Sequence, residues 1–392
     1  MNTTGFDTLG WDLPTRVLFG SGCISRLANE VNQLGGRRVL LVSDKGVADA
    51  GHVAKAQAIL DGAEIPSTLF LDIQENPTDV DVGRCAEVAR QEGSDILVGL
   101  GGGSAMDAAK GTNLLLTQGG RIQDYWGMDK VVEPMLPLIA IPTTAGTGSE
   151  VQQVALISDA RTHQKMACGG SGIRPTTAIL DPDLSLSQPA EVACSTALDA
   201  MTHALESVVT KTRTAMSQAF SGAAFRLGYP AATQILNGST DSRVRGEMLK
   251  AACYAGLAID HSMLGAAHSC ANPLTQGYGL RHGFAVGVML PYVMGFNAED
   301  PSVAAIYGDL ARTSGLIPAE ESDKKGVGVL VSIVEELCAK SGARAAFEAL
   351  DVSDGDVAQL ARAAAQQWTA QFNPRIVDIP DFENLYRLAL VR

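Results

Sequence analysis

The stretch DILVGLGGGSAMDAAKG, residues 95–111, decides the fold class of this 392-residue chain. A short apolar run comes first, a glycine-rich turn follows it, and a helix-like run of small and apolar residues comes next. Three more apolar runs, VLLVSD, STLFLD and PLIAIPTT, begin at residues 39, 67 and 137. Strands this apolar are typical of a parallel sheet that helices cover on both faces. The segments 81–93 and 104–118 have apolar residues at three- and four-residue spacing, so we expect them to be the crossover helices.

The pattern changes after LDPDLSLSQPAEVA, residues 180–193. From there to Arg392 the sequence is rich in alanine, apolar residues recur with helical periodicity, and strand-like runs are few. A chain of this length exceeds what one hydrophobic core usually supports. We therefore expect two domains, an α/β domain with a Rossmann-like parallel sheet at residues 1–185 and an all-helical domain at residues 186–392.

Composition and charge argue against several classes of protein. The net charge is -13 and the basic residues are scattered, so we expect neither nucleic acid nor an anionic membrane as a partner. Seven cysteines without a CxxC pair suggest neither a disulfide framework nor a structural zinc cluster, and they favour a reducing compartment. The N-terminus has no basic start followed by an apolar block, and no apolar stretch reaches the roughly 18 residues of a membrane span. We expect a cytoplasmic protein that binds a small ligand.

The glycine-rich run from Gly99 to Asp107 is a candidate phosphate site. It joins an apolar strand to a helix, so its backbone can approach a phosphate while free amides of the first helical turn point at the anion. Glycines also cluster in tight turns that bind nothing, and that alternative stays open. A second polar turn, PTTAGTGSE at 142–150, also follows an apolar strand, which is what an open parallel sheet offers a ligand in its crevice.

Asp44 is the candidate contact for the ribose of a dinucleotide. In the usual dinucleotide fold the acidic residue comes about 20 residues after the glycine loop, whereas Asp44 comes before Gly99, so a variant of the fold is needed. A carboxylate there would accept bonds from the ribose hydroxyls and repel a 2'-phosphate, which favours NAD over NADP. The alternative is that Asp44 only caps the helix that follows it.

Four residues in the second half form a candidate metal site. Asp199 and His203 are four apart and project from one face of a helix, and His268 and His282 follow. The GYG at 277–279 is expected to break a helix and let the chain return. One carboxylate with three imidazoles suits Fe(II) or Zn(II) better than Mg(II), which prefers oxygen ligands. An Asp/His pair at this spacing also occurs often as ordinary surface or core polar residues that bind no ion.

With these residues the sequence resembles the iron-containing (group III) alcohol dehydrogenase family, which has the dehydroquinate synthase-like fold. The match runs through most of the chain and rests on PTRVLFGSG (14–22), VSDKG (43–47), NPT (76–78), GGGSAMDAAK (101–110), IPTTAGTGSE (141–150), LDPDL (180–184), ALDAMTHALE (197–206), LGAAHSCANPL (264–274) and RHG (281–283). The resemblance implies an NAD-binding α/β domain, a helical domain that binds metal and substrate, and an active site in the cleft between them. It also suggests a homodimer or larger assembly.

The resemblance assigns roles position by position. It implies metal ligation by Asp199, His203, His268 and His282, and it places His268, Asn272 and His282 at the reacting centre. It implies cofactor contacts for Asp44, Asn76, Gly102, Gly103, Ser104, Asp107, Thr143, Thr144, Thr147 and Lys165. The family commonly has a histidine where this chain has Asn272, and an amide cannot titrate near neutral pH. The proton then leaves through water and the ribose hydroxyls, or through another group such as His261, which would share a helix face with His268.

The function expected from the sequence is hydride transfer between a small alcohol or aldehyde and NAD. A divalent ion, Fe(II) or Zn(II), would act as a Lewis acid on the substrate oxygen. Enzymes like maleylacetate reductase or dehydroquinate synthase share the fold and remain alternatives. The first works without this metal set, and the second would need a cluster of basic residues for a phosphorylated substrate. A non-catalytic NAD-binding protein is the third alternative.

Overall fold

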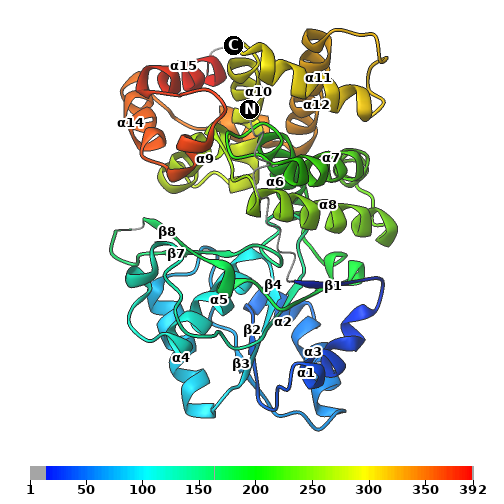
Figure 1. Cartoon of the computed structure of the whole chain (residues 1–392), viewed down its shortest axis with the longest axis vertical. Helices are drawn as coiled ribbons and strands as arrows, with labels where there is room; N and C mark the ends of the chain where they lie inside the picture. Colours follow the sequence, from blue (N-terminus) through cyan, green and yellow to red (C-terminus); the bar gives the residue numbers. More distant parts are fainter. Residues whose placement is uncertain (1–14, 163, 391–392) are drawn as a thin grey trace, which may run out of the picture.

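The computed structural model describes residues 15–162 and 164–390. Pro14, the first residue of the PTRVLFGSG motif, lies outside these residues. The N-terminal segment in which no leader sequence is expected lies outside them as well. Figure 1 shows the two parts of the molecule along its long axis, with the strands and helices α1–α5 in one part and the helices α6–α15 in the other.

A six-stranded parallel sheet is the centre of the first part. Its strand order is β1-β9-β6-β4-β2-β3, and every neighbouring pair is parallel. The four strands predicted from sequence are the contiguous set β6, β4, β2 and β3. The bounds are β1 (Arg16–Phe19), β2 (Val39–Val42), β3 (Ser67–Phe70), β4 (Ile96–Gly101), β6 (Leu138–Pro142) and β9 (Thr177–Leu180). Every residue of β2 and β4 is buried, which confirms the sheet that the apolar runs predict.

Helices cover both faces of this sheet. Leu40 and Val42 of β2 pack in one core cluster with α4 (Asp79–Glu92) and α5 (Gly103–Thr117), the two crossover helices expected from sequence. Leu41 belongs to a second cluster with α1 (Leu27–Gln33) and α3 (His52–Asp61). Successive residues of a strand point to opposite faces, so the alternation along β2 supplies both cores. The remaining short helices of this part are α2 (Lys45–Asp49), η1 (Cys23–Arg26), η2 (Ile122–Tyr125), η3 (Ser171–Ile173) and η4 (Pro182–Ser185).

A smaller sheet was not expected from the sequence. It has the order β5-β8-β7, with β5 (Gly127–Met128), β7 (Val154–Ser158) and β8 (Lys165–Gly169). In β7, Leu156 is exposed between two buried residues, and β8 begins with a lysine, so neither strand reads as a continuous apolar run.

The second part is helical, as predicted. No strand occurs in the described residues from 181 to 390. The helices are α6 (Ala190–Ser207), α7 (Ala215–Leu236), α8 (Ser242–Asp260), α9 (Ala266–Tyr278), α10 (His282–Asn297), α11 (Pro301–Thr313), α12 (Asp323–Ser341), α13 (Ala343–Glu348), α14 (Asp354–Ala365), η5 (Trp368–Phe372) and α15 (Ile379–Leu390). Helix α10 is buried along most of its length among α6, α9 and α12. The domain boundary near residue 185 stays a prediction.

Two helix ends decide where the histidines lie. Helix α9 ends at Tyr278 because Gly279 takes the left-handed conformation with φ of 66°, which confirms the break expected at GYG. Helix α8 ends at Asp260, His261 is its C-cap, and Met263 has a positive φ of 69°. The prediction that His261 shares a helix face with His268 is therefore wrong, because the two residues lie on either side of a helix break.

Asp260 joins the two parts at the end of α8. It accepts from the backbone amide of Gln153 at 2.8 Å and from Nε of Arg174 at 2.7 Å. Nearby, Gly148 and Gly256 pack backbone to backbone, since a Cβ added at Gly256 would lie 2.6 Å from the Gly148 carbonyl oxygen. The Gly148–Gly256 contact holds the 142–150 turn against α8, and Asp260 ties the end of the same helix to Gln153 and Arg174.

Candidate active site

Three neighbouring strands bring the predicted nucleotide residues together. Strands β2, β4 and β6 are adjacent and parallel, so Asp44, Gly102 and Thr143, which follow them, lie at one edge of the sheet. All three line a cavity of about 860 Å³. Asp44 also accepts from the backbone amide of Val47 at 3.0 Å and caps α2, so the alternative role as a helix cap is confirmed. The carboxylate performs that role while it lines the cavity.

The glycine-rich turn requires its glycines. A Cβ added at Gly103 would lie 2.8 Å from Cγ2 of Thr147, and Gly101 has φ of 152°. Gly102 is the N-cap of α5 and makes no side-chain cap, so the amides of the first helical turn remain available to an anion. The Ser104 hydroxyl accepts from the backbone amide of Asn76 at 3.2 Å. The two turns predicted as parts of one site therefore lie against each other.

Asp107 and a buried lysine tie α5 to the smaller sheet. Asp107 Oδ1 accepts from the Ser149 hydroxyl at 2.6 Å, and Oδ2 accepts from the amide of Leu156 at 3.1 Å. Lys110 Nζ, fully buried, donates to Ser149 Oγ and to the carbonyl of Val154, each at 2.8 Å. Asp107 thus shapes the wall through its contacts within the chain, and its contact with a cofactor stays a prediction.

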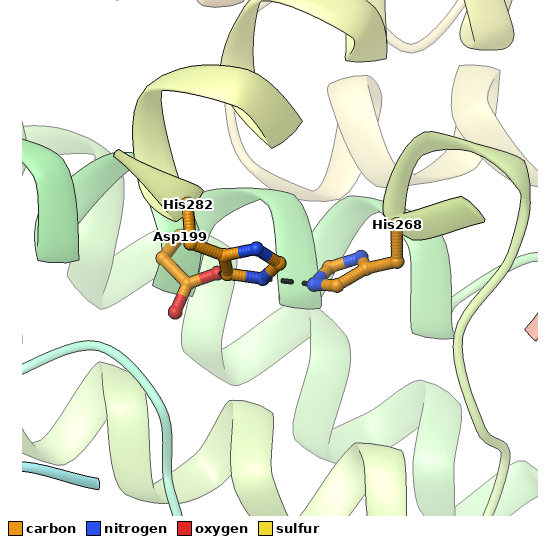
Figure 2. A group of neighbouring side chains, drawn as sticks. All are labelled: Asp199, His268 and His282. Carbon is orange, nitrogen blue, oxygen red and sulfur yellow. Dashed lines mark ion pairs between the residues drawn. The ribbon is translucent and has the colours of Figure 1, made fainter. Parts of the chain in front are cut away.

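The four predicted metal ligands come from three helices. Asp199 and His203 are one turn apart on α6, His268 lies in the first turn of α9, and His282 is the first residue of α10. Asp199 Oδ1 lies 3.4 Å from Nε2 of His203 and 3.8 Å from Nε2 of both His268 and His282. The ligand atoms of Asp199, His268 and His282 all lie within 4.8 Å of one another, and Figure 2 shows these side chains converging. His203 is beside this trio and stacks on His268, with ring centroids 4.9 Å apart.

These residues fit a divalent cation. Asp199 Oδ1 and His268 Nε2 are buried and have no hydrogen-bond partner. Distances of 3.8 Å are too long for hydrogen bonds. They are close to the separation of roughly 3 to 3.5 Å between two ligand atoms that share an ion through bonds of about 2.1 Å. An ion between them would satisfy the atoms that the protein leaves unpaired.

Burial and charge set the protonation of the group. Burial raises the pKa of Asp199, but attraction to His203 and the other imidazoles outweighs it and holds that pKa well below its usual range. Burial lowers the pKa of His282 to about 3. Burial also opposes protonation of His268, but the nearby carboxylates of Asp199 and Glu206 outweigh it and raise the pKa of His268 to about 9. At neutral pH, Asp199 is therefore an anion and His282 a neutral imidazole, the forms that bind a cation, whereas His268 carries a proton that a bound cation would displace.

The ligand group and the nucleotide residues line two cavities that share several lining residues. A cavity of about 350 Å³ contains all four ligands, Asn272 and the predicted cofactor residues Asn76, Gly102, Gly103, Ser104, Asp107, Thr144, Thr147 and Lys165. It shares Gly102, Ser104 and Thr144 with the larger cavity. Every predicted site residue therefore lines one cavity or the other. His261 lines neither.

Comparisons with known proteins agree with this geometry. Residues 14–182 match the family described as iron-containing alcohol dehydrogenase, and residues 193–390 match the C-terminal part of the Fe-containing alcohol dehydrogenase family. An NAD-dependent methanol dehydrogenase of Bacillus methanolicus is 31% identical over 383 residues, which cover 96% of this chain and 99% of that protein. The chain belongs to the iron-containing alcohol dehydrogenase family.

Solved structures of similar proteins confirm the fold of this iron-containing alcohol dehydrogenase. A 1,3-propanediol oxidoreductase has a TM-score of 0.92 at 29% identity, with 98% of this chain and 100% of that one covered. A sulfoacetaldehyde reductase of Bifidobacterium kashiwanohense in complex with NAD+ has a TM-score of 0.87 at 27% identity, with 98% and 100% covered. The chain is an oxidoreductase with the dehydroquinate synthase-like fold that its motifs predict.

Several residues of this alcohol dehydrogenase site were missed from the sequence. Gln367, Trp368 and Thr369 line the smaller cavity from the segment around η5, more than 80 residues after the last ligand, His282, and no spacing signal pointed to them. Asn272 Nδ2 donates to Gln367 Oε1 at 2.9 Å, so the departure from the family's histidine is matched by a second amide.

Glu206 was also missed, although a signal for it existed. It bonds His268 Nδ1 at 2.5 Å and lies seven residues after Asp199, on the same face of α6. The ALDAMTHALE motif contains it, but only the Asp/His pair in that motif was considered.

Proposed function

We propose that this chain is a metal-dependent, NAD-linked alcohol dehydrogenase that interconverts a small alcohol and its aldehyde by hydride transfer. One observation carries the proposal. The buried, unpartnered atoms of Asp199 and His268 lie in the cavity that connects with the edge of the parallel sheet, where the glycine-rich turn and Asp44 lie. A cation site and a nucleotide site that share walls are what metal-assisted hydride transfer requires.

The metal would be held by Asp199, His203, His268 and His282. Iron(II) is the ion that the family's name indicates, and Zn(II) suits the same donors. A bound ion of this kind supplies a Lewis acid that polarises a substrate oxygen. The protein's own contribution is to fix the donors on three helices and to exclude solvent from the buried carboxylate.

The nucleotide would lie along the carboxyl ends of β2, β4 and β6. We assign its pyrophosphate to the amides of Gly102, Gly103 and Ser104 at the start of α5. Asp44 would accept from the adenosine ribose and disfavour a 2'-phosphate, which selects NAD. Asn76, Asp107, Thr143, Thr144, Thr147 and Lys165 are the other proposed contacts.

Asn272 lines the smaller cavity and bonds Gln367. Neither amide titrates, so we assign them to binding and not to proton transfer. The proton of the alcohol would leave through water and the ribose hydroxyls. His261 lines neither cavity and is not assigned a role in this path.

The two alternatives within the fold are less favoured. An enzyme like dehydroquinate synthase would need several basic side chains for a phosphorylated substrate. Among the described residues that line the smaller cavity, Lys165 and Arg281 are the lysine and arginine, and Arg281 pairs with Glu191 through Nε and Oε1 at 2.7 Å. An enzyme like maleylacetate reductase works without this metal set, whereas Asp199 and His268 present unpartnered buried donors.

The cytoplasm and a homodimer are part of the same proposal. All seven cysteines are free, which suits a reducing compartment. None of the helices in residues 15–162 and 164–390 combines the length and the apolar character needed to cross a bilayer. The dimer rests on the family resemblance alone, and sedimentation of the purified protein tests it.

Metal removal tests the function directly. Dialysis against a chelator is expected to abolish NADH formation from short alcohols and diols, and Fe(II) or Zn(II) is expected to restore it. Elemental analysis before and after dialysis verifies the removal. Full activity in verified metal-free protein contradicts the proposal.

A further inference from the structure

Glu206 is a buried carboxylate that contacts a proposed metal ligand without being one. It follows Asp199 and His203 on α6 at positions i+7 and i+3, so one helix face presents all three side chains. Glu206 is 3% exposed. Its Oε2 bonds Nδ1 of His268 at 2.5 Å, and its Oε1 accepts from the backbone amide of Ala267 at 2.7 Å.

We propose that Glu206 is a positioning residue that presents Nε2 of His268 to the metal. A neutral imidazole has one N–H donor and one acceptor nitrogen. A carboxylate can only accept, so Glu206 keeps the proton on Nδ1 and leaves the lone pair of Nε2 facing Asp199. The proposal rests on the proposed metal site and adds the residue that orients one of its ligands.

The three imidazoles differ in how the protein orients them. His203 Nδ1 lies 3.2 Å from the carbonyl oxygen of Gly146, a neutral acceptor. Nδ1 of His282 is buried and has no hydrogen-bond partner. His268 alone among the three has a carboxylate partner at Nδ1, and a hydrogen bond to a charged group is the stronger kind. Glu206 should therefore influence metal affinity more than the Gly146 carbonyl that faces His203.

Glu206 also helps to begin α9, and a test must separate the two roles. The amide of Ala267 is bonded by Glu206, and the amide of Ala266 by Oδ1 of Asn373 at 3.2 Å. Loss of the carboxylate can therefore weaken the start of the helix as well as turn His268. Thermal unfolding of the metal-free protein reports the first effect, and metal affinity reports the second.

Glu206→Gln is the informative substitution because it keeps the size of the side chain. Its amide has an acceptor oxygen at only one of the two positions that Oε1 and Oε2 occupy, so the other position presents an NH₂ donor. If it keeps the bond to Ala267, its NH₂ group faces Nδ1 of His268 and favours the tautomer with the proton on Nε2. We expect the affinity for Zn²⁺, measured in competition with a chromophoric chelator, to fall about ten- to a hundredfold.

Glu150→Gln is the matched control, since Glu150 is also a buried glutamate but lines neither cavity. Its Zn²⁺ affinity is expected to equal that of the wild type. In Glu206→Gln the rise in Tm on adding Zn²⁺ should shrink, beyond any change in the metal-free Tm. A lower metal-free Tm with unchanged Zn²⁺ affinity assigns Glu206 a purely structural role and overturns the proposal.

Glu206→Asp keeps the test decisive if the Gln variant does not fold. It retains the charge but is one methylene shorter, so it cannot reach both partners, and its Zn²⁺ affinity is expected to fall below that of the wild type. Wild-type affinity in this variant overturns the proposal. Failure of the wild type to bind Zn²⁺ contradicts the proposed metal site. Equal Zn²⁺ binding by the wild type and the variants contradicts only the role of Glu206.

Discussion

The nucleotide side and the metal side of the cavity differ in whether their carboxylates have partners within the chain. On the nucleotide side, Asp44 caps α2 and Asp107 bonds Ser149 and Leu156, so these carboxylates have partners within the chain. On the metal side, Asp199 Oδ1 and His268 Nε2 are buried without any. A buried unpaired polar atom costs about 1 to 3 kcal/mol. The paired carboxylates of the nucleotide side shape the cavity wall. The unpaired atoms of the metal side lower the stability of the empty protein, and a bound cation would remove that free-energy penalty.

Asp199→Asn breaks the metal side and should have the largest effect. The amide keeps the shape but removes the charge that the three imidazoles surround, and we expect kcat/KM to fall roughly a thousandfold or more, because the ion stabilises the transition state by several kcal/mol. Metal content and kcat/KM are the measurements. Asp44→Ser serves as the control and should keep its metal, whereas Asp199→Asn with full metal content contradicts the ligand assignment.

Asp44→Ser tests the nucleotide side without removing its helix cap. A serine hydroxyl can still accept from the amide of Val47, so stability should change by less than about 1 kcal/mol. Loss of the charge removes the repulsion of a 2'-phosphate, and like charges brought together cost several kcal/mol. We expect the ratio of kcat/KM for NADP to that for NAD to rise about a hundredfold. An unchanged ratio would mean that Asp44 serves only as the cap.

The same contrast explains what the sequence could predict. The nucleotide residues follow strands that are apolar on both faces, so the sheet and the alignment of Asp44, Gly102 and Thr143 at its edge were predictable from local pattern. The metal ligands showed through their residue types and the spacing of Asp199 and His203. The residues of η5 and the edge strand β7 gave no local signal, because their positions depend on packing between segments far apart in the chain. His261 was misplaced because α8 ends at Asp260 and the chain then turns through Met263, whose positive φ the residue type rarely adopts and the sequence did not signal.

Glu150, which ends the 142–150 turn but lines neither cavity, is an exception that sharpens the comparison. It is buried, its Oε1 has no partner, and burial raises its pKa to about 7 from a usual value of 4.5. The pKa of Glu150 is higher in the folded state than in the unfolded state. Its contribution to the free energy of unfolding is therefore complete below about pH 4.5 and is lost as the pH rises through about 7. Glu150→Gln should therefore stabilise the protein by about 3 kcal/mol at pH 8 and have little effect at pH 4.5. Urea unfolding at both pH values measures this difference, and equal effects at both would show that Glu150 is ionised throughout.

Asn272→His is expected to have the smallest effect, and it asks whether the metal side can accept a titrating group. The Asn272–Gln367 amide pair does not ionise between pH 5 and 9, whereas a histidine has an ordinary pKa near 6.5. We expect kcat/KM to change only a few-fold, since the ligands and the nucleotide side are untouched, but its pH profile should gain one ionisation between roughly pH 5.5 and 8. Asn272→Gln, which keeps an amide, should leave the profile unchanged. If Asn272→His and Asn272→Gln both gain the same ionisation, the titrating group lies elsewhere in the cavity. The Asn272–Gln367 pair then does not control the charge beside the substrate.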